Sequence, residues 1–179
     1  LRNTANESLI ATKNVPPAAA TLNSCATNAP NPPPPAAGWA SSISVDLLAT
    51  VRVNRAVLPL MEQAGGGAII NISSIAARHA SAGMIPYGAI KAAVIQYTLS
   101  EAAAHARKGI RVNCVAPGLL EGTRATSNLR PEQIERSSSG SLLKKAADKD
   151  DCADMVVTMC RTDTMTGQTI VIDSGRFFH

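Results

Sequence analysis

The stretch AIINIS, residues 68–73, is a continuous apolar run bounded by glycines at 65–67 and by Ser74. The run is short, and residues that favour turns flank it on both sides. This pattern is typical of a β-strand buried on both faces. Such strands occur in parallel sheets covered by helices, so the stretch favours an α/β fold.

The segments around this strand alternate between helix and strand patterns. Residues 39–63 have apolar side chains near helical spacing and stop at AGGG, which predicts one long helix. Residues 87–107 are apolar on nearly every side, which predicts a helix buried all round, by the sheet on one face and by another subunit on the other. The remaining patterns predict strands at 110–117 and 169–173, a helix at 148–160, and a polar, mobile excursion at 119–141.

This order predicts a single domain, residues 1–179, with a doubly wound parallel sheet of the Rossmann type. A chain of 179 residues has the length of one domain, and with only 3% aromatic residues its core must consist mainly of Ala, Val, Ile and Leu. Residues 1–38 are rich in Asn, Ala and Pro. They are expected to be irregular, with one candidate strand at 20–26.

Charge, hydropathy and cysteine spacing exclude several classes of function. The 17 basic and 13 acidic residues give a net charge of +4, and the basic residues are scattered, which argues against nucleic acid as a partner. No apolar run reaches the ~18 residues of a membrane span. The four cysteines form no C-x-x-C pair and have no histidine nearby, so no metal site is expected and a reducing, cytoplasmic location is predicted.

Tyr87 and Lys91 are four residues apart on a predicted helix, so their side chains are neighbours. Ser74 lies thirteen residues before Tyr87, at the carboxyl end of the strand, where parallel sheets bind ligands. A tyrosine that exchanges protons near neutrality needs roughly 4 kcal/mol of bias toward the phenolate. An ammonium ~4 Å away, at an effective dielectric of ~20, supplies about that amount. The three side chains are therefore suited to proton transfer.

These residues resemble the short-chain dehydrogenase/reductase family, whose signature is Y-x-x-x-K. The resemblance covers residues from about 20 to 179 and rests on four ordered motifs: NISS, YGAIK, RVNCVAPG and TGQTIVIDSG. It implies a Rossmann-like fold and NAD or NADP as the cofactor. The implied reaction interconverts a small-molecule carbonyl and an alcohol by hydride transfer.

The resemblance also implies roles for single residues. Tyr87 would be the general acid/base, Ser74 would hydrogen-bond the substrate oxygen, and Lys91 would favour the phenolate and hold the nicotinamide ribose. Asp46 stands where the family has a fourth catalytic residue, an asparagine; a carboxylate there would oppose ionisation of the tyrosine. Asn113 and Asp173 are expected to be structural. The implied cofactor-binding residues are Ser24, Ala26, Ile72, Tyr87, Lys91, Pro117, Gly118 and Leu120.

The chain departs from the family at its beginning. The N-terminal βαβ portion with its glycine-rich, pyrophosphate-binding turn is missing, so the sequence is expected to be the back two-thirds of a longer protein, with roughly 60 to 80 residues absent. Two alternatives to an active enzyme follow. One is a catalytically inactive relative that acts as an oligomerisation or assembly partner through the helices at 40–64 and 87–107, which in the family associate as dimers or tetramers. The other is a small binding module built with residues 1–38.

Overall fold

Within the described part of the chain, the sheet has three parallel strands. The computed structural model describes residues 36–123, 126–127 and 129–178, so the candidate strand at 20–26 and the site residues Ser24 and Ala26 lie outside the described residues. The strands are β1 (Gly67–Ile72), β2 (Ile110–Pro117) and β3 (Thr169–Ile172), in the order β1-β2-β3. Gly67 pairs with Ile110 and Cys114 pairs with Thr169, so all three carboxyl ends meet at one edge of the sheet.

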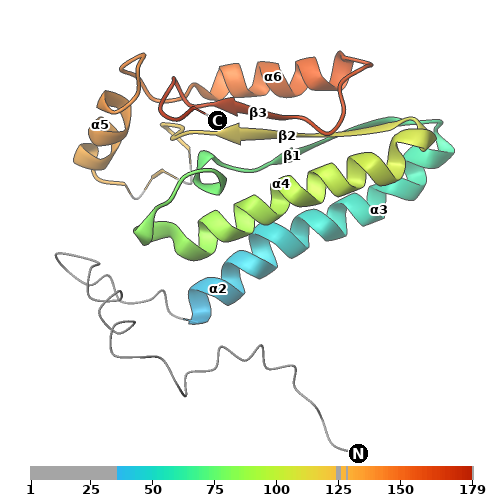
Figure 1. Cartoon of the computed structure of the whole chain (residues 1–179), viewed down its shortest axis with the longest axis horizontal. Coiled ribbons are helices and arrows are strands. Elements are labelled where there is room, and N and C mark those ends of the chain that lie inside the picture. Colours follow the sequence, from blue (N-terminus) through green and yellow to red (C-terminus); the bar gives the residue numbers. More distant parts are fainter. Residues whose placement is uncertain (1–35, 124–125, 128, 179) are drawn as a thin grey trace, which may run out of the picture. The chain divides into compact units, whose positions relative to one another are not determined.

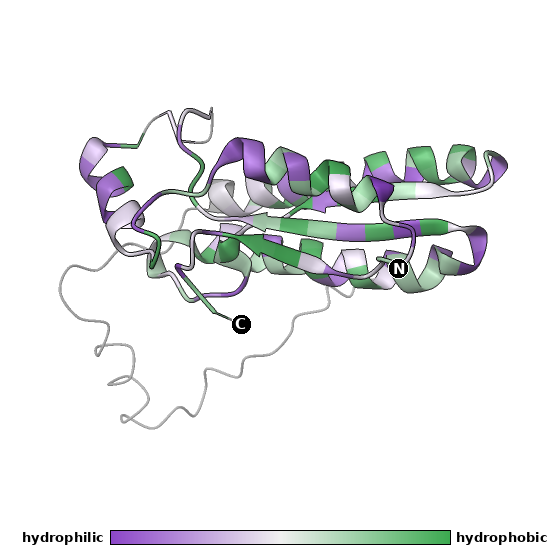
Figure 2. Cartoon of the chain, turned by 90° about the horizontal axis from the view of Figure 1, so that it is seen from above, coloured by the Kyte–Doolittle hydropathy of each residue, from purple (hydrophilic) through white to green (hydrophobic). Residues whose placement is uncertain are grey.

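Helices cover both faces of this sheet (Figure 1). On one face lie α2 (Ala36–Ser42), α3 (Ala49–Gln63) and α4 (Ile85–His105), and on the other lies α6 (Lys149–Arg161). Figure 2 shows hydrophobic colour along most of the strands between these helices. β2 is the most deeply buried strand, since every one of its residues except Arg111 is buried. The doubly wound parallel sheet predicted from the sequence is confirmed.

The helix predicted over 39–63 is present, but it is not regular. Between α2 and α3 the chain forms one π-helical segment, η2 (Ile43–Leu48), in which the Ala49 amide donates to the Ser44 carbonyl five residues back. Such wide turns are rare and are frequent at functional sites. The segment contains Asp46, so the irregularity changes the direction in which this carboxylate projects.

Within this chain, the helix predicted at 87–107 is buried on one face, and the burial of its other face by another subunit stays a prediction. The buried positions of α4 form a single stripe, in which residues follow one another at four-residue spacing. They are Pro86, Ile90, Val94, Thr98 and Ala102. Ile85 and Leu99 are exposed by 49% and 42%. The sheet and its flanking segments cover one face of α4, and the opposite face has no comparable cover among the described residues.

The excursion predicted at 119–141 is more regular than expected in its second half, and its mobility stays a prediction. This segment contains α5 (Pro131–Ser139), which starts with a proline and is capped by the Gln133 side chain, whose Oε1 accepts from the Arg130 amide at 3.0 Å. Ser141 beyond the helix is 1% exposed, and its hydroxyl lies 2.8 Å from the carbonyls of both Ser138 and Lys145. Caps and side-chain hydrogen bonds order a segment that has few apolar residues.

The predicted helix at 148–160 is confirmed as α6. Its N-cap is Asp148, whose carboxylate accepts from the amides of Asp150 at 2.6 Å and Asp151 at 3.3 Å. These hydrogen bonds hold the pKa of Asp148 below its usual value. Among the residues that the structure describes, no helix has the length and apolar character needed to cross a bilayer.

Candidate active site

The first part of the site is the end of β1. Ser73 continues the parallel ladder with its amide on the Val115 carbonyl at 2.8 Å, and its hydroxyl donates to the Lys91 carbonyl at 2.7 Å. This second bond ties the strand end to α4. Ser74 follows as the N-cap of the short 3₁₀ helix η3 (Ile75–Ala77), and its oxygen accepts from the Ala76 amide at 3.2 Å. The hydroxyl proton of Ser74 is therefore left to donate elsewhere.

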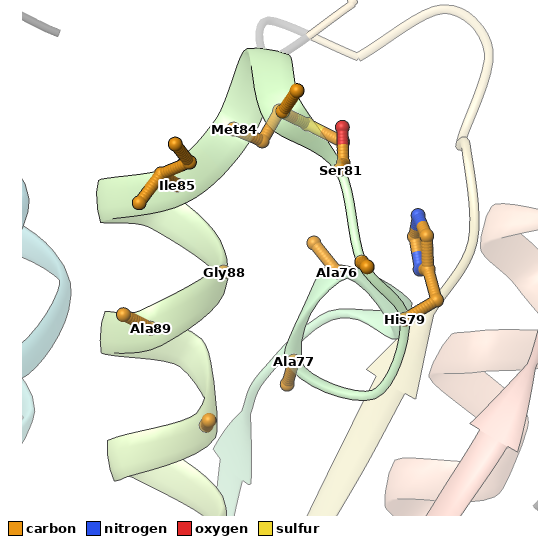
Figure 3. Close-up of a pocket in the computed structure, with 11 residues that line it drawn as sticks. Ala76, Ala77, His79, Ser81, Met84, Ile85, Gly88 and Ala89 are labelled. Atoms are coloured by element: carbon orange, nitrogen blue, oxygen red, sulfur yellow. The ribbon is translucent and has the colours of Figure 1, made fainter. Parts of the chain in front are cut away.

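Gly88 brings the first turn of α4 close to η3. A Cβ at this position would lie 2.8 Å from the Ala76 carbonyl oxygen, closer than real Cβ contacts, so only glycine permits this approach (Figure 3). Because Gly88 immediately follows Tyr87, the close packing places the tyrosine beside the residues that follow β1. The sequence motif YGAIK thus contains both the reactive side chain and the glycine that positions it.

Lys91 has three partners at the centre of the site. Its Nζ donates to the Ile72 carbonyl at 3.2 Å, lies 3.4 Å from Asp46 Oδ1, and lies 5.5 Å from the centroid of the Tyr87 ring. The side chains of Lys91 and Asp46 are only 12% and 27% exposed. The structure therefore brings together Tyr87, Lys91 and Asp46, and the π-helical segment presents the carboxylate directly to the ammonium.

The ends of β2 and β3 form the opposite wall. The Gly118 amide donates to the Ile172 carbonyl at 2.8 Å, and a Cβ on Gly118 would lie 2.9 Å from the Cβ of Asp173. Glycine is thus required where the two strands end. Asn113, earlier in β2, donates through its amide nitrogen to the Met165 carbonyl at 2.8 Å and is fully buried. The roles of Asn113 and Asp173 in the structure are contacts with the backbone and packing.

These elements enclose a cavity of about 590 Å³, which we call the central cavity. The predicted site residues that line it are Ile72, Ser74, Tyr87, Lys91, Pro117, Gly118 and Leu120. Asp46 is not among the lining residues and reaches the cavity only through Lys91. Residues from the ends of all three strands and from α4 therefore meet at one hollow.

Several lining residues were not anticipated from the sequence. Arg176 and His79 carry ionisable groups, while Met84, Leu129 and Leu119 add apolar surface. Arg176 lies four residues after the end of β3, so its position beyond the carboxyl end of a parallel strand was the available signal. The cavity also lies near Cys114, but burial raises the pKa of this thiol and it is fully enclosed.

A second hollow of about 460 Å³ adjoins the central cavity and is drawn in Figure 3. Small and apolar side chains from η3, from the loop after it and from α4 line this hollow, among them Ala77, Ala89 and Ile85. His79 is its one ionisable lining residue among the described residues. The second hollow shares Ala76, His79 and Met84 with the central cavity. It offers apolar surface but no set of reactive groups.

Comparison with known proteins agrees with this geometry. The family model described as enoyl-(acyl carrier protein) reductase matches residues 18–176. Dehydrogenase/reductase SDR family member 4 of Homo sapiens is 34% identical over 140 residues, which are 76% of this chain and 50% of that protein. The 3-oxoacyl-(acyl-carrier-protein) reductase FabG of Chlamydia pneumoniae is 37% identical over 143 residues, covering 76% of this chain and 56% of that protein.

Solved structures show the same likeness. ElxO with NADP bound superposes with a TM-score of 0.70 at 30% identity, covering 77% of this chain and 57% of that one. The 7α-hydroxysteroid dehydrogenase complexed with NADH and 7-oxo glycochenodeoxycholic acid has a TM-score of 0.74 at 26% identity, covering 79% and 56%. The chain spans about half the length of the curated relatives it matches. By its family model, its relatives and its fold, the chain belongs to the short-chain dehydrogenase/reductase family.

Proposed function

We propose that the chain carries the catalytic part of an NAD(P)(H)-dependent oxidoreductase that interconverts a carbonyl and an alcohol. The observation that carries the proposal is the convergence of Ser74, Tyr87 and Lys91 on the central cavity. Proton exchange with a substrate oxygen requires a hydroxyl donor, a phenol and an ammonium in one partly enclosed space, and these three groups are present here. Membership of an oxidoreductase family supports this choice of reaction.

In the direction of reduction, Tyr87 gives its phenol proton to the substrate oxygen as negative charge develops there. Ser74 donates its remaining hydroxyl proton to the same oxygen, since the oxygen atom of Ser74 is already held by the Ala76 amide. Lys91 stabilises the resulting phenolate through its ammonium, 5.5 Å from the ring centroid. When bound, NADH or NADPH supplies the hydride.

The lining of the cavity fits the nicotinamide end of such a cofactor. Lys91 Nζ is held at the cavity by the Ile72 carbonyl and can donate to ribose hydroxyls, and the Ile72 side chain is 48% exposed, which offers an apolar surface. The turn at Pro117 and Gly118 with Leu120 forms the wall opposite. The solved relatives named above hold NADP and NADH, which supports either dinucleotide as the cofactor.

Asp46 lowers the efficiency of this arrangement. Its carboxylate lies 3.4 Å from Lys91 Nζ, so its negative charge offsets part of the stabilisation that the ammonium gives to the Tyr87 phenolate. An asparagine, which the family carries there, has no charge. We therefore expect a slow enzyme rather than an inactive one.

The proposed substrates are small molecules, and neither nucleic acid nor a membrane is proposed as a partner. A homo-oligomeric state, a dimer or tetramer, is part of the proposal. The cytoplasmic location and the description of residues 1–179 as a single domain stay predictions.

A fluorescence titration with NADH and, separately, NADPH tests the proposal directly. The wild-type chain should bind one of them saturably, and Lys91→Gln should weaken that binding about tenfold, because one charge-assisted hydrogen bond to the ribose is lost. Lys108→Gln, which removes an ammonium far from the cavity, is the matched control. A folded wild-type chain that binds neither dinucleotide would contradict the proposal.

A second candidate function is that of an assembly partner without catalytic activity. Val53 and Leu60 on α3 are exposed by 61% and 64%, and seven residues separate them, so they project from one face of the helix. Val45 in η2 is exposed by 66%. We propose a second copy of this chain as the occupant of this face. Sedimentation velocity should give a dimer or larger species for the wild type and a monomer for Val53→Asp combined with Leu60→Asp; a monomeric wild type would remove the idea.

A further inference from the structure

The residues after β3 form a compact turn, Asp173–Phe177, which we call the C-terminal turn. Asp173, which is 8% exposed, organises it: Oδ1 accepts from the amides of Gly175 at 3.0 Å and Arg176 at 3.2 Å, and Oδ2 accepts from the Phe177 amide at 2.9 Å. Ser174 and Gly175 both adopt positive φ, 58° and 72°. Three hydrogen bonds to one carboxylate fix the directions in which the next two side chains leave the turn.

The side chains of Phe177 and Arg176 leave the turn toward two different elements. The Phe177 ring stacks on His79 with centroids 4.0 Å apart and planes at 13°. The His79 ring itself is fixed, because its Nδ1 lies 2.9 Å from the Ile75 carbonyl and therefore carries the proton. The Arg176 guanidinium lies 5.4 Å from the centroid of Phe177. The turn is thus anchored on the loop after β1.

Arg176 is also anchored on α5, but through one nitrogen only. Its Nη1 donates to the carbonyls of Ser137 at 2.5 Å and Arg136 at 3.3 Å. A Cβ at Gly140 would lie 2.6 Å from this nitrogen, so glycine at that position makes room for the guanidinium. The guanidinium has five N–H donors, and within the described part of the chain Nη2 and Nε have no hydrogen-bond partner.

The charged side chains among the described residues that line the central cavity are both cationic. They are Arg176 and Lys91, and no Asp or Glu is among these lining residues. Lys91 is paired with Asp46, whereas Arg176 has no carboxylate within salt-bridge distance among the described side chains. Arg176 is therefore the cation of the cavity wall that no acidic side chain neutralises there.

We propose that the central cavity takes carbonyl or alcohol substrates that carry a carboxylate, and that Arg176 binds this carboxylate. The inference rests on the proposed function and adds the chemical class of the substrate. A guanidinium has two parallel N–H donors on Nε and Nη2, a fork that can donate one hydrogen bond to each oxygen of a carboxylate. On Arg176 both nitrogens lack a hydrogen-bond partner among the described residues. Its bonds through Nη1 and the stacking of Phe177 hold the fork in place before the substrate arrives, which lowers the cost of ordering it.

The test uses a keto acid and its methyl ester, 4-oxo-4-phenylbutanoate and methyl 4-oxo-4-phenylbutanoate, which differ in charge but share the reacting ketone. The ratio of kcat/KM for acid over ester should fall about 10- to 100-fold in Arg176→Gln, mainly through KM for the acid. The glutamine side chain is shorter than that of arginine, so the bond from Nη1 to the Ser137 carbonyl is lost as well, and turnover of the ester, which carries no carboxylate, reports what that loss alone costs. Arg176→Lys should recover part of the ratio because it keeps the charge but not the fork.

Arg136→Gln is the matched control, because it removes an exposed arginine side chain from the same region without touching the cavity. It should leave the ratio within about twofold of the wild type. An unchanged ratio in Arg176→Gln, or an equal loss for acid and ester, would overturn the inference while leaving the proposed function intact.

A binding measurement separates the inference from the proposed function. Saturation-transfer NMR should detect 4-phenylbutanoate, but not its methyl ester, on the wild-type chain, and should lose the acid signal in Arg176→Gln. If neither keto substrate is turned over but this pattern of binding is found, the proposed function fails and the carboxylate site stands. If acid and ester bind alike, the carboxylate site is wrong.

Discussion

The two tyrosines of the chain lie on the same helix and have the same spacing to an ionisable residue, yet their surroundings are opposite. Tyr87 is followed four residues later by Lys91 and faces the central cavity. Tyr97 is followed four residues later by Glu101 and has a buried hydroxyl with no hydrogen-bond partner among the described residues. Burial, and then the charge of Glu101, raise the pKa of Tyr97 to about 12.

The neighbours of Tyr97 form a structural cluster at the far end of α4. His105 lies between two carboxylates, with Nε2 3.5 Å from Glu101 and Nδ1 3.6 Å from Glu62, and Lys108 Nζ lies 2.6 Å from Glu62. The Lys108 ammonium holds the pKa of Glu62 below its usual value. These contacts join the carboxyl ends of α3 and α4. The same spacing on one helix therefore gives two different environments, and of the two tyrosines it is Tyr87 that has the neighbouring positive charge and the open cavity that the proposed proton donor needs.

Among the substitutions that alter the surroundings of the two tyrosines, the largest effect is expected when the charge beside Tyr87 is removed. Lys91→Gln should lower kcat/KM by about 100-fold, as the loss of one preorganised electrostatic group typically does. Lys108→Gln removes the same charge from the cluster near Tyr97 and should leave kcat/KM within about twofold. The measurement is the rate of NADH- or NADPH-dependent ketone reduction. Equal effects of the two substitutions on this rate would show that the positive charge beside Tyr87 has no special part in the reaction.

A buried hydrogen-bond chain that ends at Thr98, the residue after Tyr97, should matter for stability. Asn54 donates to Asn71 at 3.2 Å, Asn71 donates to Thr98 at 3.0 Å, and all three residues are buried. Thr98→Val leaves the Asn71 amide without its acceptor and should lower the free energy of unfolding by about 1–3 kcal/mol. The measurement is urea denaturation.

Thr158→Val is the control for that experiment. Thr158 makes the same bond to the carbonyl four residues back as Thr98 does, but on an exposed helix surface. Its replacement should change the free energy of unfolding by less than about 0.5 kcal/mol. Similar losses for the two variants would show that burial of the hydrogen-bond chain contributes nothing.

A smaller effect in the opposite direction is expected at Asp46. Asp46→Asn removes the carboxylate that lies 3.4 Å from Lys91 Nζ, so the ammonium acts more strongly on Tyr87. Partly exposed ion pairs are worth up to about 1 kcal/mol, which corresponds to a two- to fivefold rise in kcat. A fall in kcat would mean that the carboxylate itself takes part in proton transfer.

The smallest effect concerns the pH dependence of stability near Tyr97. Because the pKa of Tyr97 is raised to about 12 in the folded chain, the unfolded chain releases this proton first when the pH rises above about 10. The folded chain is thus fully stabilised below pH 10 and loses stability as the pH rises toward 12. Between pH 9 and 11 the wild type should lose about 1 kcal/mol more than Tyr97→Phe in urea denaturation, after allowance for solvent screening. Parallel losses in the two proteins would contradict this assignment.

The strands and helices that follow from the spacing of apolar residues could be predicted from the sequence, whereas a helix that depends on local caps and side-chain hydrogen bonds could not. β2 and α6 agree with the apolar patterns to within a residue or two. Tyr87 was predicted from its four-residue spacing to Lys91, and Ser74 from its place at the carboxyl end of a parallel strand; in the structure all three side chains line the central cavity. α5 was missed because its order comes from a cap and from side-chain bonds rather than from an apolar face.

The place of Arg176 in the cavity wall and the pairing of Asp46 with Lys91 could not be predicted from the sequence. Arg176 reaches the cavity only because Asp173 folds the C-terminal turn through two residues with positive φ. Asp46 meets Lys91 across a π-helical segment, which no helical periodicity of 3.6 residues describes. In both cases a local departure from regular structure sets the contact.

The comparison of Tyr87→Phe with Tyr97→Phe tests the assignment of the proton donor most directly. Each substitution removes one hydroxyl from α4 and leaves the ring, and initial rates of ketone reduction with the preferred dinucleotide measure the effect. Tyr87→Phe should lower kcat by about 100- to 10,000-fold, the usual contribution of a general acid, while Tyr97→Phe should stay within about twofold of the wild type. If Tyr87→Phe reduces the same ketones at the wild-type rate, Tyr87 is not the proton donor.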